Sequence, residues 1–387
     1  MHIGNYQRVL RIISGGPISR VGLSRLTGLT QPAIGNLTGQ MLADGIIEEA
    51  GKLQEDTGAG RRPVLLSLTP SWGYIGCISI DRDEICAGIC DLGGSIVLSP
   101  CYFPYPDDVE QTLDLLCDTL KDMIRTHLPA NSRIIGVGVI APGPLNSSTG
   151  MMINPPSFDR WNGLNLLDEM RKRLTWPVFT EHNSTAIARA ELRLVSSEKY
   201  RNFAIYFINA GIGLGLVLNG EIYTGIDGIG CEIGHTSIDV NGRLCSCGNR
   251  GCLDLYASTA AVVHDARRVD GSLDSWRKIV DRAIDSCDRF CDELLKLQAS
   301  YLAGSMINLD NLLTLDAIII AGQATYRGEY LCDKIRRRIS RSLAGSGRVP
   351  DIRLSSISGH TSLSGAGAVV LSQFFYNELF LSCGLTI

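Results

Sequence analysis

A glycine-rich apolar segment, FAIYFINAGIGLGLVLNGEIYTG (residues 203–225), constrains the fold of this chain more than any other stretch. Its apolar runs have the length of strands, and they are interrupted at Asn209-Ala210-Gly211 and at Asn219-Gly220, which are typical turn sequences. The same interruptions make the segment too short and too broken to cross a bilayer. The segment therefore predicts a β-hairpin. Glycine is abundant, with 42 of 387 residues, which favours a fold with many tight strand connections.

Strand-like runs alternate with amphipathic helical stretches on both sides of this segment. Before it, the sequence predicts a three-stranded meander, an amphipathic helix, a buried strand, and a strand that runs into a helix: YIGCISI, ICAGICDL, SIVLSPCYF, VEQTLDLLCDTLKDMIRTHL, IIGVGVIAPG and VFTEHNSTAIARAEL. The hairpin begins a similar second series, and the last third is mostly helical around one buried strand, DAIIIAG. The repetition predicts two related α/β lobes, residues 71–190 and 191–361, with the first lobe completed by the C-terminal helix at about 362–387.

The first 70 residues have a different pattern. The sequence predicts a helix over Tyr6–Ser14, a short helix around Leu23 and Leu26, and a third helix over Gln31–Leu42 that Thr30 caps. Two strands, IIEEAG and RPVLLSLTP, follow and are joined by a polar loop. This order is typical of a winged helix-turn-helix domain. Up to Thr69, seven basic and five acidic side chains give the domain a charge of +2, so the rest of the chain carries −6 of the total of −4.

In a winged helix the second helix of the motif enters the major groove of DNA. Glutamine and asparagine can pair with adenine, so we expect base contacts from the polar side chains of that helix: Gln31, Asn36, Thr38 and Gln40. We expect phosphate or minor-groove contacts from the flanking residues and the wing loop: Arg20, Arg25, Thr30, Arg61 and Arg62. A solvated polar helix face is the alternative interpretation. One head makes few contacts, so the expected binding unit is a dimer on a palindromic operator.

The segment GHTSIDVNGRLCSCGNRGC carries the sharpest chemical signal. One imidazole and three thiolates form the closed four-ligand set that structural zinc prefers, which predicts one Zn²⁺ per chain held by His235, Cys245, Cys247 and Cys252. Glycines 248 and 251 would allow the backbone to wrap around the ion. The alternative is three unrelated buried thiols and a surface histidine. The other ten of the 13 cysteines are scattered, and no signal peptide is recognisable, so we expect reduced thiols in a cytoplasmic protein.

Three stretches together, GVGVIAPGPL, INAGIGLGLVLNGEIYTGIDGIGCEIGH and CSCGNRGCLD, resemble the ROK family of repressors and sugar kinases. The predicted head makes the chain similar to the repressor branch, and the resemblance covers nearly the whole chain. It implies a two-lobed, actin-like or sugar-kinase-like α/β fold with a hexose between the lobes.

The resemblance also implies the residues that contact the sugar. Glu232 and His235 of CEIGH match the sugar-contacting pair of the family, in which this histidine is also a zinc ligand. Asp254 stands where the family usually has a glutamate, and Asn154 lies in a loop that often contacts the sugar. His182 and Asn183 occupy the positions of the Asn-Asp pair of the kinases, which completes the expected set.

Departures from the kinase pattern indicate that the chain is not an enzyme. The catalytic aspartate is replaced by Asn183, whose amide cannot accept the proton of the sugar, and loss of a general base costs about 10²–10⁴ in rate. The first phosphate loop of the kinases contains Gly-Gly-Thr, but here it reads Asp81, Arg82 and Asp83, whose carboxylates would repel phosphate. Gln323 follows Gly322 where two glycines are usual.

We therefore expect a DNA-binding repressor of carbohydrate-utilisation genes, a homodimer or tetramer that responds to a sugar or sugar phosphate. Ligand binding would move the heads out of register with the two half-sites. Two alternatives remain open at this point: a sugar kinase with a fused DNA-binding head, and a repressor controlled by a protein partner such as a sugar-transporter domain. Nothing in the sequence indicates a membrane partner.

Overall fold

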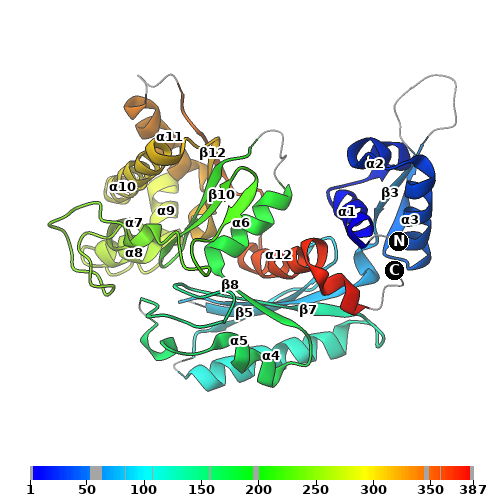
Figure 1. The fold of residues 1–387 in the computed structure, drawn as a ribbon. Helices are drawn as coiled ribbons and strands as arrows, with labels where there is room; N and C mark the ends of the chain where they lie inside the picture. Colours follow the sequence, from blue (N-terminus) through cyan, green and yellow to red (C-terminus); the bar gives the residue numbers. More distant parts are fainter. Residues whose placement is uncertain are drawn as a thin grey trace.

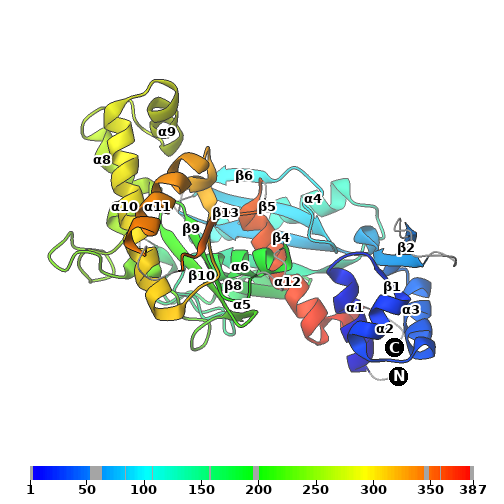
Figure 2. The ribbon, with the colours of Figure 1, turned by 90° about the horizontal axis from the view of Figure 1, so that it is seen from above.

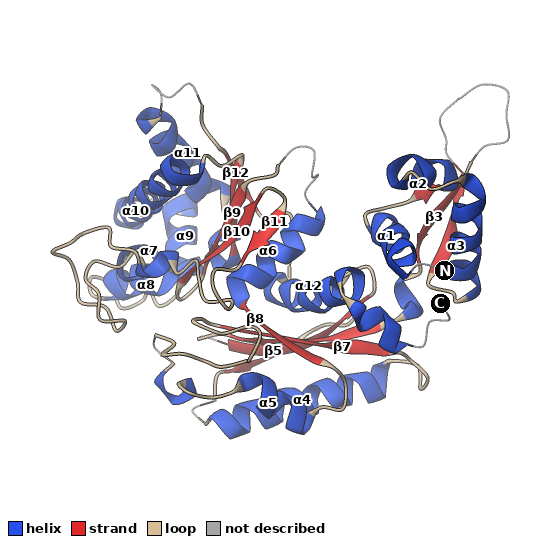
Figure 3. Ribbon diagram, in the orientation of Figure 1, coloured by secondary structure: helices blue, strands red, loops and turns tan. Residues whose placement is uncertain are grey.

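The computed structural model describes residues 3–52, 63–82, 84–106, 108–156, 158–194, 200–343, 348–357 and 359–383. Three sheets organise the molecule: a small one near the N-terminus and two of five strands, each covered by helices (Figures 1 and 3). The strand orders of the two larger sheets, β6-β5-β4-β7-β8 and β11-β10-β9-β12-β13, are equivalent. This repetition confirms the predicted α/β fold with two related lobes.

The first lobe begins with the predicted meander. Its strands are β4 (Tyr74–Ile80), β5 (Glu84–Asp91), β6 (Cys101–Pro104), β7 (Ile134–Ala141) and β8 (Val178–His182). The last two strands run parallel to β4, so their carboxyl ends meet at one edge of the sheet. Helices α4 (Val109–His127) and α5 (Leu166–Arg173) cover the lower face in Figure 1, and two 3-10 turns complete the lobe, η1 (Pro70–Trp72) and η2 (Asp159–Trp161).

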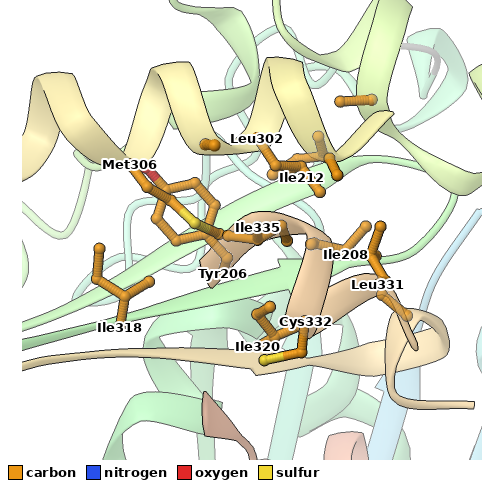
Figure 4. Packing of buried hydrophobic residues seen from close by; sticks show 14 of the residues in the cluster. Tyr206, Ile208, Ile212, Leu302, Met306, Ile318, Ile320, Leu331, Cys332 and Ile335 are labelled. Atoms are coloured by element: carbon orange, nitrogen blue, oxygen red, sulfur yellow. The ribbon is translucent and has the colours of Figure 1, made fainter. Parts of the chain in front are cut away.

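The second lobe is built on the predicted hairpin. Its strands are β9 (Phe203–Ile208), β10 (Ile212–Leu218), β11 (Glu221–Tyr223), β12 (Ala317–Ala321) and β13 (Asp351–Leu354). The helices are α7 (Asp254–Ala257), α8 (Thr259–Arg267), α9 (Trp276–Asp285), α10 (Arg289–Leu313) and α11 (Glu329–Ser342), with the 3-10 turns η3 (Ile233–His235) and η4 (Gly322–Thr325). The core forms where Tyr206 and Ile318 of the sheet pack against Met306 of α10 and Ile335 of α11 (Figure 4). The sequence pattern did not predict the short edge strand β13.

Two helices join the lobes by crossing between them. Helix α6 (Asn183–Leu194) follows the last strand of the first lobe but packs on β9 and β10 of the second. Helix α12 (Thr361–Tyr376) follows the second lobe but packs on β4, β5 and β7 of the first (Figures 1 and 2). The helices contact each other at Gly365, where a Cβ atom would lie 3.1 Å from the backbone nitrogen of Ile187. Each lobe thus uses a helix that belongs to the other half of the sequence.

The N-terminal head has the predicted order of a winged helix-turn-helix. Its elements are α1 (Ile3–Ser14), β1 (Ile18–Ser19), α2 (Arg20–Thr27), α3 (Gln31–Ala43), β2 (Ile47–Lys52) and β3 (Val64–Leu68). Gly28 ends α2 in the left-handed conformation with φ 73°, and the Thr30 hydroxyl accepts a hydrogen bond from the Ala33 N–H at the start of α3. The two-residue strand β1, which pairs with β3, was not predicted.

Aromatic packing attaches the head to the C-terminal end of the chain. Tyr6 of α1 stacks on Phe380 of η5 (Glu378–Cys383), with ring centroids 6.2 Å apart. Trp72 packs against Phe374 of α12 at 5.8 Å, and the Arg133 guanidinium lies over the indole at 3.9 Å. Helix α1 and the turn η5, which lie far apart in the sequence, are therefore neighbours in the fold. The head, η1 and α12 therefore share one hydrophobic cluster.

Within the described ranges, no helix combines the length and the apolar character that a membrane span requires.

Gly138 of β7 lies directly against α12, and a Cβ atom there would come within 2.0 Å of the Ala366 carbonyl oxygen. Gly138→Ala should lower the free energy of unfolding by about 3 kcal/mol or more, because the helix must move away from the sheet. Gly304 in α10 has open space at the same position, so Gly304→Ala should instead raise it by about 1 kcal/mol. Urea unfolding measures both values, and equal effects of the two substitutions would contradict this packing.

Candidate ligand cleft, metal cluster and DNA-facing surface

The two lobes face each other across a polar cleft at the carboxyl ends of β4, β7, β8 and β9. Ligands of α/β proteins commonly bind beyond the carboxyl ends of strands, so the location fits a binding site. The lining residues come from both lobes: Asp81, Arg82, Pro142, Gly143, His182, Asn183, Phe207, Asn209, Gly211, Ile212, Gly213, Glu232, His235 and Asp254.

Five of the six residues expected to contact a sugar line this cleft: His182, Asn183, Glu232, His235 and Asp254. Asn154 does not. Its side chain is exposed on a neighbouring loop, and its backbone N–H donates to Asn162 Oδ1 at 2.8 Å. That Asn154 contacts a sugar therefore stays a prediction, and the structure does not place it among the lining residues of the cleft. Its backbone has φ 43°, and two residues later the Pro156 carbonyl accepts a hydrogen bond from Arg82, a residue that does line the cleft.

The hydrogen bonds of His182 determine which of its ring nitrogens carries the proton. Ser184 Oγ donates its single hydrogen to the Leu214 carbonyl oxygen at 3.0 Å, so it can only accept from His182 Nδ1, which lies 3.0 Å away. His182 Nε2 is then left as an acceptor beside Gly143, where a Cβ atom would approach it to 2.9 Å. Burial lowers the pKa of His182 from 6.5 to about 4, so the ring is neutral at physiological pH.

Two carboxylates of the second lobe face the first. Asp254 begins α7, and its Oδ1 accepts the Ile212 N–H at 2.6 Å, which fixes the side chain toward the cleft. Glu232 precedes η3 and lies so close to Gly143 that a Cβ atom there would be 2.6 Å from Glu232 Oε1. Burial, and then the nearby charge of Asp254, raise the pKa of Glu232 to about 7. Both groups accept hydrogen bonds, which suits hydroxyl recognition.

Two residues after β4 connect the lobes, and our sequence analysis did not place them in the binding site. Arg82 Nη1 lies 3.4 Å from Asp254 Oδ2, and Nη2 donates to the Pro156 carbonyl at 3.0 Å. Asp81 Oδ2 accepts from Asn209 Nδ2 at 2.9 Å. The sequence signal that could have found Asp81 and Arg82 was the replacement of the phosphate-loop glycines by charged residues, because that loop borders the cleft.

The predicted metal ligands converge beside the cleft. The ligand atoms of His235, Cys245, Cys247 and Cys252 all lie within 4.8 Å of one another, so the cluster could hold a metal ion. Cys245 Sγ lies 3.6 Å from His235 Nδ1, which leaves the other ring nitrogen for the cleft. The loop between the ligands depends on Gly251, which has φ 69° and where a Cβ atom would come within 1.7 Å of the Asp239 carbonyl oxygen. This agrees with the expectation that glycines let the chain wrap around an ion.

The head presents a polar surface, with one correction to the expected contacts. Arg25, Thr30, Gln31 and Asn36 are exposed, Gln40 is half-buried, and Arg61 and Arg62 lie outside the described residues. Thr38 is fully buried and donates to the Ile34 carbonyl, so the prediction that it contacts a base is wrong. Arg20 Nε donates to Thr38 Oγ1 at 3.0 Å, and it therefore braces α2 against α3. Helical spacing alone does not determine which side of α3 is covered, and it placed Thr38 on the exposed side although the side chain is buried.

Similarity to known proteins extends over nearly the whole chain. The sequence profile of the ROK family matches residues 75–373. The chain belongs to the ROK family. A xylose repressor of Bacillus spizizenii is 29% identical over 365 residues, which cover 94% of this chain and 93% of the relative. The DNA-binding transcriptional dual regulator NagC of Escherichia coli is 26% identical over 381 residues, which cover 95% and 92%.

Solved structures of ROK proteins have the same fold. A ROK family transcriptional regulator, described as a homolog of the E. coli MLC protein, has a TM-score of 0.75 at 25% identity and covers 98% of both chains. A ROK glucokinase from Streptomyces griseus in complex with glucose and AMPPNP has a TM-score of 0.68 at 24% identity, and covers 76% of this chain and 98% of its own. The regulator therefore matches the full length, whereas the likeness to the kinase concerns the fold of the two lobes.

The lowered pKa of His182 makes stability depend on pH. In the unfolded chain this group takes up a proton near pH 6.5, but the folded protein resists protonation down to about pH 4. The stability is therefore fully present above pH 6.5 and is lost, by about 3 kcal/mol in total, as the pH falls toward 4. In His182→Asn this part of the acid dependence should disappear. Urea unfolding between pH 4 and pH 7 measures it, and an unchanged dependence would show that another group causes it.

Proposed function

We propose that the protein is a transcriptional repressor of carbohydrate-utilisation genes, controlled by a sugar that binds between the lobes. One observation carries the proposal: a single chain joins a winged-helix head with an exposed polar third helix to a body whose cleft is lined with hydroxyl-binding groups. The names of the relatives, a xylose repressor and NagC, support the same function. We divide the chain into a head (1–70), a first lobe (71–190 with the C-terminal segment from about 362), and a second lobe (191–361).

Helix packing supplies a physical connection between cleft and head. Asn183 lines the cleft and begins α6, which packs against α12, and Phe374 near the end of α12 packs against Trp72. A change in the angle between the lobes would therefore displace the surface on which the head rests. To act as an inducer, the sugar must bind the DNA-incompetent arrangement more tightly, and a tenfold preference contributes about 1.4 kcal/mol.

We propose that Gln31, Asn36 and Gln40 contact bases, that Arg25 and Thr30 contact phosphates, and that Arg61 and Arg62 do so from the wing. The exposure of the first residues of α3 supports this assignment, because the N-terminal part of a recognition helix reaches the base edges. A homodimer or tetramer, assembled through helices of the second lobe, would place two heads on a palindromic operator. Chromosomal DNA as the target makes the cytoplasm the expected compartment.

We further propose that the cleft has no phosphoryl-transfer activity. Asn183 Oδ1 accepts the Ser184 N–H at 2.7 Å, and an amide there is no general base. Arg82 occupies the position of a phosphate-binding glycine and is held by Asp254. On the second lobe, the Gln323 side chain accepts from Thr259 Oγ1 at 2.9 Å. These contacts support the proposal that the cleft does not transfer phosphate.

For the metal cluster we propose one structural Zn²⁺ held by His235, Cys245, Cys247 and Cys252. Three thiolates, a neutral imidazole and a divalent ion form a nearly neutral closed set. When bound, zinc on His235 Nδ1 would fix the ring with its other N–H toward a ligand hydroxyl. The proposed metal therefore supports both the loop and the cleft.

Sugars should change the affinity of the protein for its operator. In the presence of a neutral hexose or pentose from a panel, the apparent dissociation constant for operator DNA should rise at least about tenfold, and Glu232→Ala should remove this response by deleting a hydroxyl acceptor. Fluorescence anisotropy of labelled operator measures both. Glu221→Ala, at an exposed carboxylate on β11, is the matched control and should respond like the wild type.

Three results would contradict this proposal. Unchanged operator affinity with every sugar would exclude a sugar effector. If such a protein instead bound a sugar-transporter domain in a pull-down, control by a protein partner would be favoured. Phosphorylation of a hexose from ATP, abolished in Glu232→Ala, would favour a kinase.

Metal content should depend on the cluster and not on thiols in general. Cys247→Ser should lose the ion and lower the melting temperature, because an unligated loop cannot hold its tight turns. Cys287→Ser removes another exposed thiol, far from the cluster in sequence, and should retain one zinc per chain. Atomic emission on freshly purified protein measures the ion. Less than one zinc per wild-type chain would contradict the assignment.

A further inference from the structure

The charged groups that line the cleft are unevenly distributed between the two signs. Three carboxylates, those of Asp81, Glu232 and Asp254, face it. Among the described lining residues, Arg82 is the one arginine or lysine. With both histidines neutral, the described lining carries a formal charge of −2 when all three carboxylates are ionised and −1 when Glu232, whose pKa is raised to about 7, is protonated. An anion that entered would meet more repulsion than attraction.

The positive charge of Arg82 is paired with a carboxylate of the protein itself. Its guanidinium lies 3.4 Å from Asp254 Oδ2 and donates to the Pro156 carbonyl at 3.0 Å. It also rests against Gly211, where a Cβ atom would come within 2.7 Å of Nη1. Only about a tenth of the Asp254 side chain and a fifth of the Arg82 side chain are exposed, so water screens the pair weakly. The pair lies in the lining of the cleft and links its two sides.

The hydrogen-bonding groups of the cleft also disfavour an anionic ligand. The ionised carboxylates of Asp81 and Asp254 and the ring nitrogen His182 Nε2 only accept hydrogen bonds. A phosphate or carboxylate group also only accepts, so facing it with these groups would leave acceptors opposed to acceptors in a desolvated site. A hydroxyl can donate to a carboxylate and accept from Arg82 or from the Asn183 amide. The lining is therefore matched by several hydroxyls and by no anionic group.

We propose that the Arg82–Asp254 pair makes the cleft selective for an uncharged polyhydroxyl ligand, a free sugar, against its phosphorylated or acidic counterpart. This inference rests on the proposed effector site and narrows its ligand class. Because the pair joins the two lobes, a sugar that bonds to Asp254 contacts a residue that also links them. Arg82 is thus a specificity-determining residue that also positions the lobes.

Matched ligand pairs test the proposal by isothermal titration calorimetry on the full-length, zinc-analysed protein. The pairs are D-xylose with D-xylonate, D-glucose with D-glucose 6-phosphate, and N-acetylglucosamine with its 6-phosphate. For at least one pair, the wild type should bind the neutral member about tenfold or more tightly than the anionic one. Asp254→Asn removes the carboxylate that holds Arg82 but keeps an acceptor for the Ile212 N–H. It should lower the ratio of the dissociation constants, anionic over neutral ligand, about tenfold. Arg82→Gln should widen it.

The control variant is Asp122→Asn, at an exposed carboxylate on α4, which should leave the ratio unchanged. Tighter binding of an anionic member by the wild type, or a ratio that neither cleft variant moves, would overturn the charge selection while the sugar-responsive function stood. Failure of every neutral and anionic member to bind would overturn the effector role itself, and this inference with it. If Asp254→Asn loses its zinc, Arg82→Gln alone tests the charge selection: a larger ratio supports it and an unchanged ratio overturns it.

Discussion

The close crossing of α6 and α12 is the contact on which the rest of the structure depends. Each helix covers the sheet of the lobe to which it does not belong in sequence, so neither lobe has a complete core without the other half of the chain. Glycines make the fit possible: Gly215 lies against the Ser184 carbonyl of α6, and Gly138 against Ala366 of α12. Because interiors are close-packed, a shift of one helix must be taken up by the other. The cleft lies at the first residue of α6, and the head packs near the last turns of α12.

Much of this architecture could be predicted because its causes are local. Periodicity located α4, the hairpin strands and α3, and the turn chemistry of Gly28 and Thr30 placed the helix boundaries of the head. The cluster of His235 and three cysteines that could hold a metal ion could be read from residue type and spacing alone. The prediction was weakest where tertiary contact decides: the short strand β13 exists because β12 pairs with it, and Thr38 is buried by contacts that helical spacing does not determine.

The site shows the same division between local and distant causes. Glu232, His235 and Asp254 were found by motif, because neighbouring glycines and the metal loop fix them locally. Arg82 was seen in the sequence only as an interruption of a phosphate loop, since its partners Asp254 and Pro156 lie 172 and 74 residues away along the chain. Asn154 is exposed on a neighbouring loop, a position that its motif does not determine. A departure from the family pattern thus marked a contact between the lobes that the matching residues did not reveal.

The attachment of the head has a consequence for how the protein is made. The head is synthesised before the rings that hold it, because Phe374 and Phe380 follow it far along the chain. During translation the winged helix therefore exists as a tethered, unanchored module, able to meet DNA before the body can control it. Anchoring waits for the final turns of α12, and contacts so distant in sequence form late. The packing that connects the cleft to the head is complete only when α12 docks.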